Sequence, residues 1–189
     1  MSEETTPLIP HLGLLVLDIQ APFLKVLPNA DSLVGRSAFA VATANLFGIP
    51  TLFTEQRPDV LQSTVQELID LHPDAPRIAK TGFSAFTEPA IEEWVQENEL
   101  HHVLIAGLET SICVYQTALD AINADVEVTL LSDAVGCRRP PDGEVAISSL
   151  RIHGAHSLPS ESIFYSILRD STHPKFKEFT ALVKKYSDK

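Results

Sequence analysis

The sequence predicts an α/β fold, a three-layer α/β/α sandwich built on a doubly wound, mostly parallel, six-stranded sheet of Rossmann-like order 3-2-1-4-5-6. Six short apolar runs alternate with segments of helical periodicity, a pattern typical of strands that helices bury on both faces. The chain has 189 residues, 44% of them apolar, and no low-complexity tract or linker. We therefore expect residues 1–189 to form one domain with a complete core.

The six apolar runs are too short for stable helices and are predicted to be strands. They cover residues 12–19, 51–54, 77–80, 103–106, 126–131 and 157–159. The first run, LGLLVLDI, carries Asp18 near its C-terminal end, and the third, RIAK, ends in Lys80. Because the carboxyl ends of parallel strands meet at one edge of a sheet, both side chains are predicted to lie at that edge.

Helical spacing of apolar residues, with capping and stop signals, predicts the intervening helices. Asp31 is expected to cap a helix that stops at Gly48, and Thr87 is expected to open a helix that includes Trp94. The predicted helices cover residues 31–47, 60–71, 87–95, 111–123, 142–153, 160–168 and 174–183.

Charge and cysteine content limit the classes of partner. The chain has 14 Lys+Arg against 25 Asp+Glu, a net charge of −11, and no basic stripe, so we expect no binding to nucleic acid or to membrane surfaces. Two cysteines make no disulfide framework, and the N-terminal MSEETTPLIP lacks the order of a signal peptide. A cytoplasmic protein is predicted.

The stretch from 107 to 113, GLETSIC, joins a predicted strand to a predicted helix. Gly107 permits a tight exit from the strand, Thr110 is a candidate helix N-cap, and Cys113 would fall in the first helical turn. Unpaired N–H groups and the helix dipole stabilise a thiolate there, as expected for a nucleophile. The alternative is that Cys113 is a small buried apolar residue.

Strand order predicts that Asp18, Lys80 and Cys113 converge. The switch point lies between the first and fourth strands, about 4.8 Å apart, and Lys80 would reach in on its long side chain from two strands away. The carboxylate could accept the thiol proton, and the ammonium could stabilise both anions. We expect its attraction to keep the thiolate stable well below the ordinary cysteine pKa of about 8.5. As alternatives, Asp18 could cap a helix and Lys80 could be a surface charge.

Three motifs resemble the Asp-Lys-Cys triad of the isochorismatase-like cysteine hydrolases. They are Asp18 in LLVLDIQAPF, Lys80 in KTGFSAF and Cys113 in GLETSICVYQTALDA. The chain is most similar to the branch of isochorismatase domain-containing proteins, through TEQ at 54–56, SDA at 132–134, Ser160 with Glu161, and HPKFKE at 173–178.

The resemblance implies that Asp18 is the general base, Lys80 the electrostatic partner and Cys113 the nucleophile of a covalent mechanism. It also implies a cis peptide bond between Leu108 and Glu109. Candidates for the substrate pocket and oxyanion site are Gln20, Phe23, Phe83, Phe86, Leu108, Glu109, Thr110 and Tyr115. For the four aromatic residues, ordinary core packing is the alternative.

Two departures from the family narrow the function. Members that hydrolyse isochorismate have glycine where this chain has Cys113, so isochorismatase activity is not expected. Nicotinamidase relatives bind a metal through an aspartate and two histidines, whereas residues 54–63 read TEQRPDVLQS, with Asp59 and no histidine. We predict no metal and no cofactor.

The sequence thus predicts a metal-independent cysteine hydrolase that cleaves a small amide, ureido or related C–N bond. A non-catalytic binding or scaffold protein and a redox-responsive thiol protein are the alternatives. The resemblance also suggests a homodimer or homotetramer. The apolar residues of the last predicted helix could pack either on this domain or on a neighbouring subunit.

Overall fold

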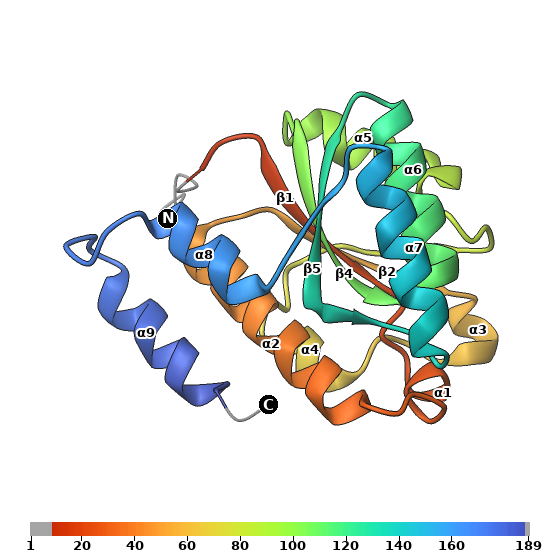
Figure 1. Ribbon diagram of the computed structural model, residues 1–189, viewed down its shortest axis with the longest axis horizontal. Coiled ribbons are helices and arrows are strands. Elements are labelled where there is room, and N and C mark those ends of the chain that lie inside the picture. The colour runs from red at the N-terminus through yellow and green to blue at the C-terminus, as the bar shows by residue number, and fades with distance from the viewer. Residues whose placement is uncertain (1–8, 188–189) are drawn as a thin grey trace.

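The computed structural model describes residues 9–187, and its centre is one six-stranded sheet (Figure 1). The strands are β1 (Leu12–Leu17), β2 (Thr51–Gln56), β3 (Arg77–Lys80), β4 (His102–Leu108), β5 (Glu127–Gly136) and β6 (His156–Leu158). Their order is β3-β2-β1-β4-β5-β6 and each neighbouring pair is parallel, so the predicted fold class is confirmed.

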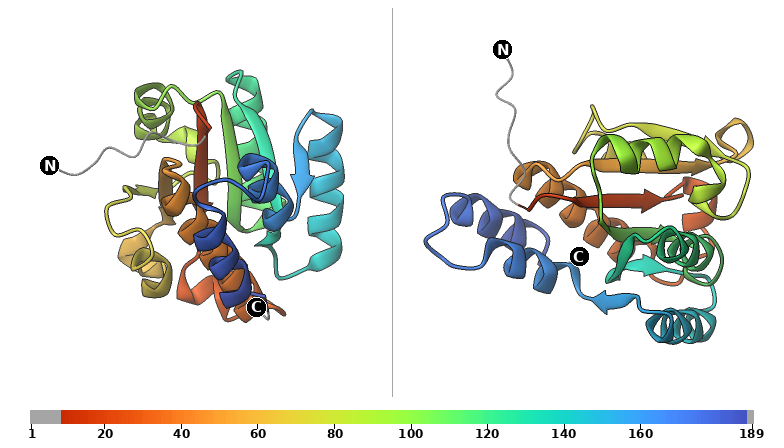
Figure 2. Two further views of the ribbon diagram at one scale, coloured as in Figure 1. Left: turned by 90° about the vertical axis from the view of Figure 1, so that its left-hand side faces the viewer. Right: turned by 90° about the horizontal axis from the view of Figure 1, so that it is seen from above.

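Helices cover both faces of the sheet (Figure 2). One face carries α5 (Pro89–Glu97), α6 (Tyr115–Asn123) and α7 (Pro140–Ile152), and the other carries α2 (Ala30–Phe47), with α8 (Ser160–Leu168) and α9 (Phe176–Lys185) beside it. The short elements are α1 (Ala21–Leu24), α3 (Pro58–Leu61), α4 (Gln66–Ile69), a 3₁₀ turn η1 (Ala85–Thr87) and a π-helical turn η2 (Thr110–Val114). Within residues 9–187, no helix has the length and apolar character to cross a membrane.

Alternate residues of β1 point into two separate apolar clusters. Leu14 and Val16 belong to the cluster under α2, whereas Leu15 and Leu17 belong to the cluster under α5 and α6. All four side chains are buried, as expected for a central parallel strand, and each contributes about 1.5–3 kcal/mol by leaving water.

The aromatic residues of α2, α8 and α9 form one packed group. The ring of Phe39 lies 5.7 Å from that of Phe164 and 6.0 Å from that of Phe179. The apolar side chains of α9 therefore pack on this domain, which decides between the two alternatives that the sequence left open for the last helix.

The predicted helix over residues 60–71 is wrong, because α3 and α4 are separate. Gln62 between them has a φ of 65°, and Thr64 pairs with Gln20 in an isolated antiparallel bridge. The backbone N–H of Thr64 donates to the buried Glu55 carboxylate at 2.9 Å. This tertiary bond holds the segment extended where local periodicity favours a helix.

The other differences from prediction lie at element ends. β1 stops at Leu17, and β5 runs beyond the predicted 131 to Gly136 through an irregularity in its pairing with β4. Helix α5 begins at Pro89, because Thr87 belongs to the preceding 3₁₀ turn, and α9 begins at Phe176. Residues 1–8, most of the segment in which we expect no signal peptide, lie outside the described residues.

Replacing Phe39 with alanine should lower the free energy of unfolding by about 3–5 kcal/mol, because the fully buried ring would leave a cavity among its aromatic neighbours. Urea denaturation measures the loss. The matched control is Phe83→Ala, since Phe83 is 57% exposed, and it should change stability by less than about 0.5 kcal/mol. Equal losses in the two variants would contradict the packing described.

Candidate active site

The residues predicted to react meet at the carboxyl edge of the sheet. Asp18 follows β1 directly, Lys80 is the last residue of β3, and Cys113 lies in η2, which follows β4. Asp18 has a φ of 53°, so its backbone turns at the strand end. Asp18 and Cys113 line a cavity of about 150 Å³, which we call the Cys113 cavity.

A buried ion pair joins two of these residues. The Lys80 Nζ lies 2.8 Å from the Asp18 Oδ2, and the two side chains are 0% and 2% exposed. Lys80 therefore reaches across the position of β2, as its long side chain allows. Because the pair is out of water, its charges interact much more strongly than a surface pair would.

The hydrogen bonds of the Lys80 ammonium go to other acceptors. It donates to the Gln56 Oε1 at 2.5 Å, to the Gly82 carbonyl at 3.2 Å and to the Phe83 carbonyl at 3.1 Å. An ammonium has three N–H donors, so these acceptors use all of them. The Asp18 Oδ2, 2.8 Å from the same nitrogen, competes with them for these three N–H groups.

The two oxygens of the Asp18 carboxylate differ in their hydrogen-bond partners. Oδ1 accepts a hydrogen bond from the Thr54 hydroxyl at 2.8 Å. Oδ2 is buried, and besides its 2.8 Å contact with the Lys80 ammonium it accepts no hydrogen bond of good geometry within the described range 9–187. An anionic oxygen in this state can accept a proton from a neighbouring group, and Cys113 lies beside it in the same cavity.

Two hydrogen bonds join the Gln20 side chain to the Gln56 backbone behind the ion pair. The Gln56 backbone N–H donates to the Gln20 Oε1 at 2.8 Å, and the Gln20 amide donates to the Gln56 carbonyl at 3.0 Å. The Gln56 amide then donates to the Thr81 carbonyl at 2.9 Å, which orients its Oε1 toward Lys80. Gln20 therefore supports the site without lining the Cys113 cavity.

Gly107 brings the ends of β1 and β4 together. Its φ is +123°, and a Cβ built there would lie 2.1 Å from the Leu17 carbonyl oxygen. No side chain fits that space, so a glycine is needed for the η2 turn to start beside Asp18. One residue further along the chain, the peptide bond between Leu108 and Glu109 is cis.

The pKa of the Cys113 thiol is raised to about 11, chiefly by burial and next by the negative charge of Asp18. The positive charge of Lys80 and the Glu109 backbone lower it by less. The expectation of a thiolate that persists below about 8.5 is therefore wrong. The cysteine is a neutral thiol at rest, because the apolar surroundings disfavour the anion.

The candidate pocket residues divide into two groups. Phe23, Phe83, Leu108 and Glu109 line the Cys113 cavity. Thr110 instead is buried at the start of η2 and lines a neighbouring cavity with Cys137, and it makes no N-cap bond.

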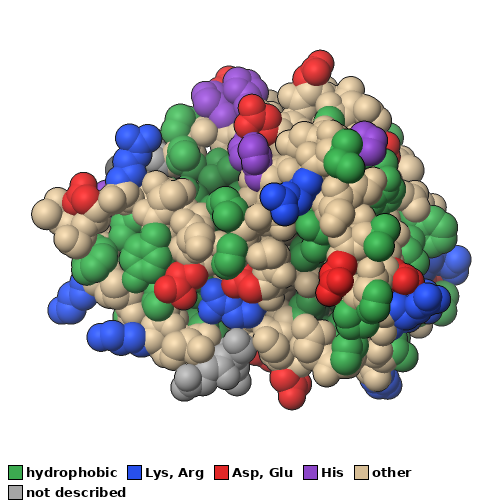
Figure 3. Space-filling model, viewed as in Figure 1, with side chains coloured by type: hydrophobic (Ala, Val, Ile, Leu, Met, Phe, Trp, Pro, Cys, Tyr) green, Lys and Arg blue, Asp and Glu red, His purple; other side chains and the backbone are tan. Residues whose placement is uncertain are grey.

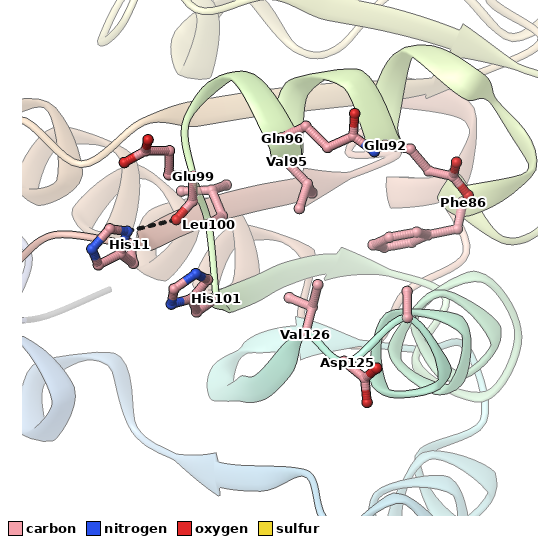
Figure 4. A pocket seen from close by; sticks show the side chains of 11 residues that line it. His11, Phe86, Glu92, Val95, Gln96, Glu99, Leu100, His101, Asp125 and Val126 are labelled. Atoms are coloured by element: carbon pink, nitrogen blue, oxygen red, sulfur yellow. Dashed lines mark hydrogen bonds between the residues drawn. The ribbon is translucent and has the colours of Figure 1, made fainter.

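Two aromatic candidates lie away from the cavity. Tyr115 packs in the apolar cluster under α6, and its hydroxyl lies 3.2 Å from that of Ser149. Phe86 lines a separate open groove of about 720 Å³, where it lies on the far side of Val95 from His11 and His101 (Figure 4). For Tyr115 the alternative of ordinary packing therefore holds. The sequence could not predict this, because the position of Tyr115 in the chain does not specify which side of η2 its side chain faces.

The sequence did not identify four residues that line the Cys113 cavity, which are Val26, Gln56, Ile112 and Arg138. The Arg138 Nε lies 3.4 Å from the Glu109 Oε1, so an arginine and a carboxylate stand together at the exposed rim. TEQ at 54–56 includes Gln56 and GLETSIC at 107–113 includes Ile112, whereas no motif pointed to Val26 or Arg138. Arg138 comes from the turn after β5, whose extension was not predicted.

No group of three or more His, Cys, Asp or Glu side chains suited to a metal ion occurs in the part of the chain that the structure describes. The charge opposite Asp18 is supplied by Lys80.

Comparisons with known proteins agree on one family. The isochorismatase domain model matches residues 13–162. Isochorismatase domain-containing protein 2 from Bos taurus is 37% identical over 177 residues, which are 92% of this chain and 83% of the relative. The MAR1 ribonuclease structure from Caenorhabditis elegans has a TM-score of 0.86 at 29% identity and covers 93% of this chain and 92% of its own. YcaC from Pseudomonas aeruginosa has a TM-score of 0.87 at 23% identity, covering 100% of this chain and 96% of its own, and shows the fold alone.

Asp18→Asn should lower the pKa of Cys113 from about 11, because it removes the negative charge and the acceptor while Lys80 remains. Thiolate absorbance at 240 nm, followed against pH in a Cys137→Ser background, measures the midpoint for Cys113 alone. The same background with Asp18 intact is the control. A midpoint near 8.5 in that control, or an upward shift in Asp18→Asn, would contradict the account of the site.

Proposed function

Because the chain belongs to the isochorismatase domain family, whose members are hydrolases, we propose that it is a cysteine hydrolase that cleaves a small amide, ureido or related C–N bond. Asp18, Lys80 and Cys113 carry the reaction. The observation that supports this most directly is the buried Asp18 Oδ2, which lies 2.8 Å from the Lys80 ammonium and accepts no other hydrogen bond of good geometry within residues 9–187. A purely structural ion pair has no need of an unfilled acceptor next to a thiol.

In the first step, Cys113 transfers its proton to the Asp18 Oδ2 as its sulfur attacks the substrate carbon. The carbonyl π electrons move to the oxygen, so the tetrahedral intermediate carries one negative charge while the protonated Asp18 becomes neutral. Lys80 keeps its proton and stabilises the anion. A thiol pKa of about 11 favours transfer that accompanies the attack, because the free thiolate is rare at neutral pH.

In the second step, the intermediate collapses and the C–N bond breaks. Asp18 returns its proton to the departing nitrogen, which leaves as ammonia or an amine, and the acyl group remains on the sulfur as a thioester. A water molecule then attacks the thioester carbon, gives one proton to Asp18, and releases the acid as that proton returns to Cys113. Asp18 thus acts as base and acid in turn, and no external reactant is needed besides water.

The size and lining of the Cys113 cavity favour a small substrate. Its volume of about 150 Å³ is below the roughly 300–1,000 Å³ of pockets for drug-sized ligands. The walls are mostly apolar, from Phe23, Val26, Phe83 and Ile112, and Glu109 with Arg138 stands at the rim. A substrate with a short apolar body and one polar end suits this arrangement.

The two alternatives from the sequence fit less well. A redox-responsive cysteine is normally exposed and of low pKa, whereas Cys113 is buried with a raised pKa. A scaffold would not require a buried lysine directed at an aspartate beside a thiol. The C. elegans relative is named a ribonuclease, but a net charge of −11 and a cavity of about 150 Å³ favour a small molecule over RNA.

Replacing Cys113 with alanine should lower turnover by more than about 10³-fold, because the nucleophile is lost. Ammonia release from a panel of small amides and carbamoyl compounds measures it. Cys137→Ser is the matched control and should keep activity, since serine can retain the hydrogen bond to the Arg139 carbonyl. Turnover that persists in Cys113→Ala would exclude this mechanism.

Exhaustive dialysis against a chelator should leave the activity unchanged, because Lys80 supplies the positive charge that a metal supplies in metallohydrolases. Elemental analysis of the purified protein should show less than one zinc, iron or manganese per chain. Activity that is lost to the chelator and restored by a divalent metal would refute the metal-independent reaction.

A further inference from the structure

Helix α7 (Pro140–Ile152) presents apolar side chains away from its own sheet. Val145 is 70% exposed and Ile152 is 87% exposed. They are seven residues apart, so they lie on one stripe of the helix, with the exposed Ser148 between them. The opposite side of α7, which includes Ala146 and Leu150, is buried against the domain. The helix is therefore apolar on two sides, which a monomeric surface helix does not require.

Opposite charges accompany the exposed stripe. Glu144 and Arg151 are also seven residues apart and lie on the same flank of Val145 and Ile152. Both are exposed, and neither forms an ion pair with another residue of the range 9–187. On the visible side of the molecule, hydrophobic side chains are interspersed with charged ones in the region of α7 (Figure 3).

The exposed surface continues from α7 onto the edge strand β6. A groove of about 430 Å³ is lined by Arg151, residues 154–157 and Leu158. Leu158 is 47% exposed, and β6 has a strand on one side only. Figure 2 shows α7 and β6 together at one outer edge of the molecule. We define the α7 face as Val145, Ser148, Ile152, Glu144, Arg151 and this groove.

We infer that the α7 face binds the α7 face of a second copy of this chain, with the two helices antiparallel about a two-fold axis. That axis places Val145 against the partner's Ile152, and it places Glu144 beside the partner's Arg151, in each case twice. The small Ser148 lies near the axis, where it lets the helices approach to about 8–10 Å.

The pattern of charges on α7 favours a second copy of this chain as the partner, with the two helices antiparallel. In a parallel pair the flank that carries Glu144 and Arg151 would lie on opposite sides of the two helices, so neither charge would meet an opposite charge from the partner's flank. A uniformly basic or acidic partner would complement only one of the two residues. The antiparallel arrangement also sets the N-terminal end of the partner's helix, with its two prolines, over the groove beside β6. This interface goes beyond the proposed function and does not depend on it.

The test measures mass in solution by light scattering after size-exclusion chromatography at micromolar concentration. The wild type should have at least twice the chain mass of 20.7 kDa. Ile152→Glu should halve the mass of the assembly, because it places two carboxylates against the partner's Val145 in the apolar part of the interface. The matched control is Val60→Glu on α3, where Val60 is 64% exposed, and it should leave the mass unchanged.

A charge exchange tests the direction of the helices. Glu144→Arg and Arg151→Glu should each raise the dissociation constant at least about tenfold by setting like charges together, and the double variant should recover wild-type affinity. The four substituted positions, 60, 144, 151 and 152, are exposed, so all of these variants should fold. Circular dichroism checks that they do. A wild-type mass of 20.7 kDa, an Ile152→Glu protein of wild-type mass, or a double variant no better than the single variants would each overturn the inference.

Discussion

The buried ion pair between Lys80 and Asp18 is the interaction on which the site depends. Both charges are out of water, so leaving either one without the other would cost about 3–5 kcal/mol. The order β3-β2-β1 separates their backbones by one strand, and only a long side chain can close that gap. Gln56, on the intervening β2, accepts a Lys80 hydrogen bond and so occupies the space between them. The three neighbouring strands are thereby joined at their ends by side-chain interactions as well as by the sheet.

Backbone geometry brings the third residue to this pair. A Cβ at position 107 would lie 2.1 Å from the Leu17 carbonyl oxygen, so the exit of β4 passes closer to β1 than any side chain permits. The η2 turn therefore starts beside Asp18, and Cys113 lines the same cavity. The proposed chemistry consequently depends on a glycine that takes no part in it, since a displaced η2 would separate the thiol from Asp18, its proposed proton acceptor.

The sequence predicted what depends on strand order and failed where packing decides. The alternation of short apolar runs with helical segments predicted a doubly wound sheet, and hence the edge at which Asp18, Lys80 and Cys113 meet. It did not predict that Gln20 faces backbone carbonyls behind the site or that Phe86 lies in another groove, because the direction of a loop side chain is set by distant contacts. Arg138 was missed since the extension of β5 to Gly136 follows from irregular pairing, which has no local pattern.

The raised pKa of Cys113 follows from the same burial that strengthens the ion pair. Sequence position suggested a thiolate at a helix start near a lysine, but removal from water disfavours the anion more than Lys80 favours it. The Asp18 carboxylate, which lines the same cavity as Cys113, is then the acceptor proposed for the thiol proton. In the proposed reaction, the proton would therefore stay on sulfur until a substrate carbon can receive the electron pair. Proton transfer would accompany bond formation, which would limit the reactivity of the cysteine toward other electrophiles.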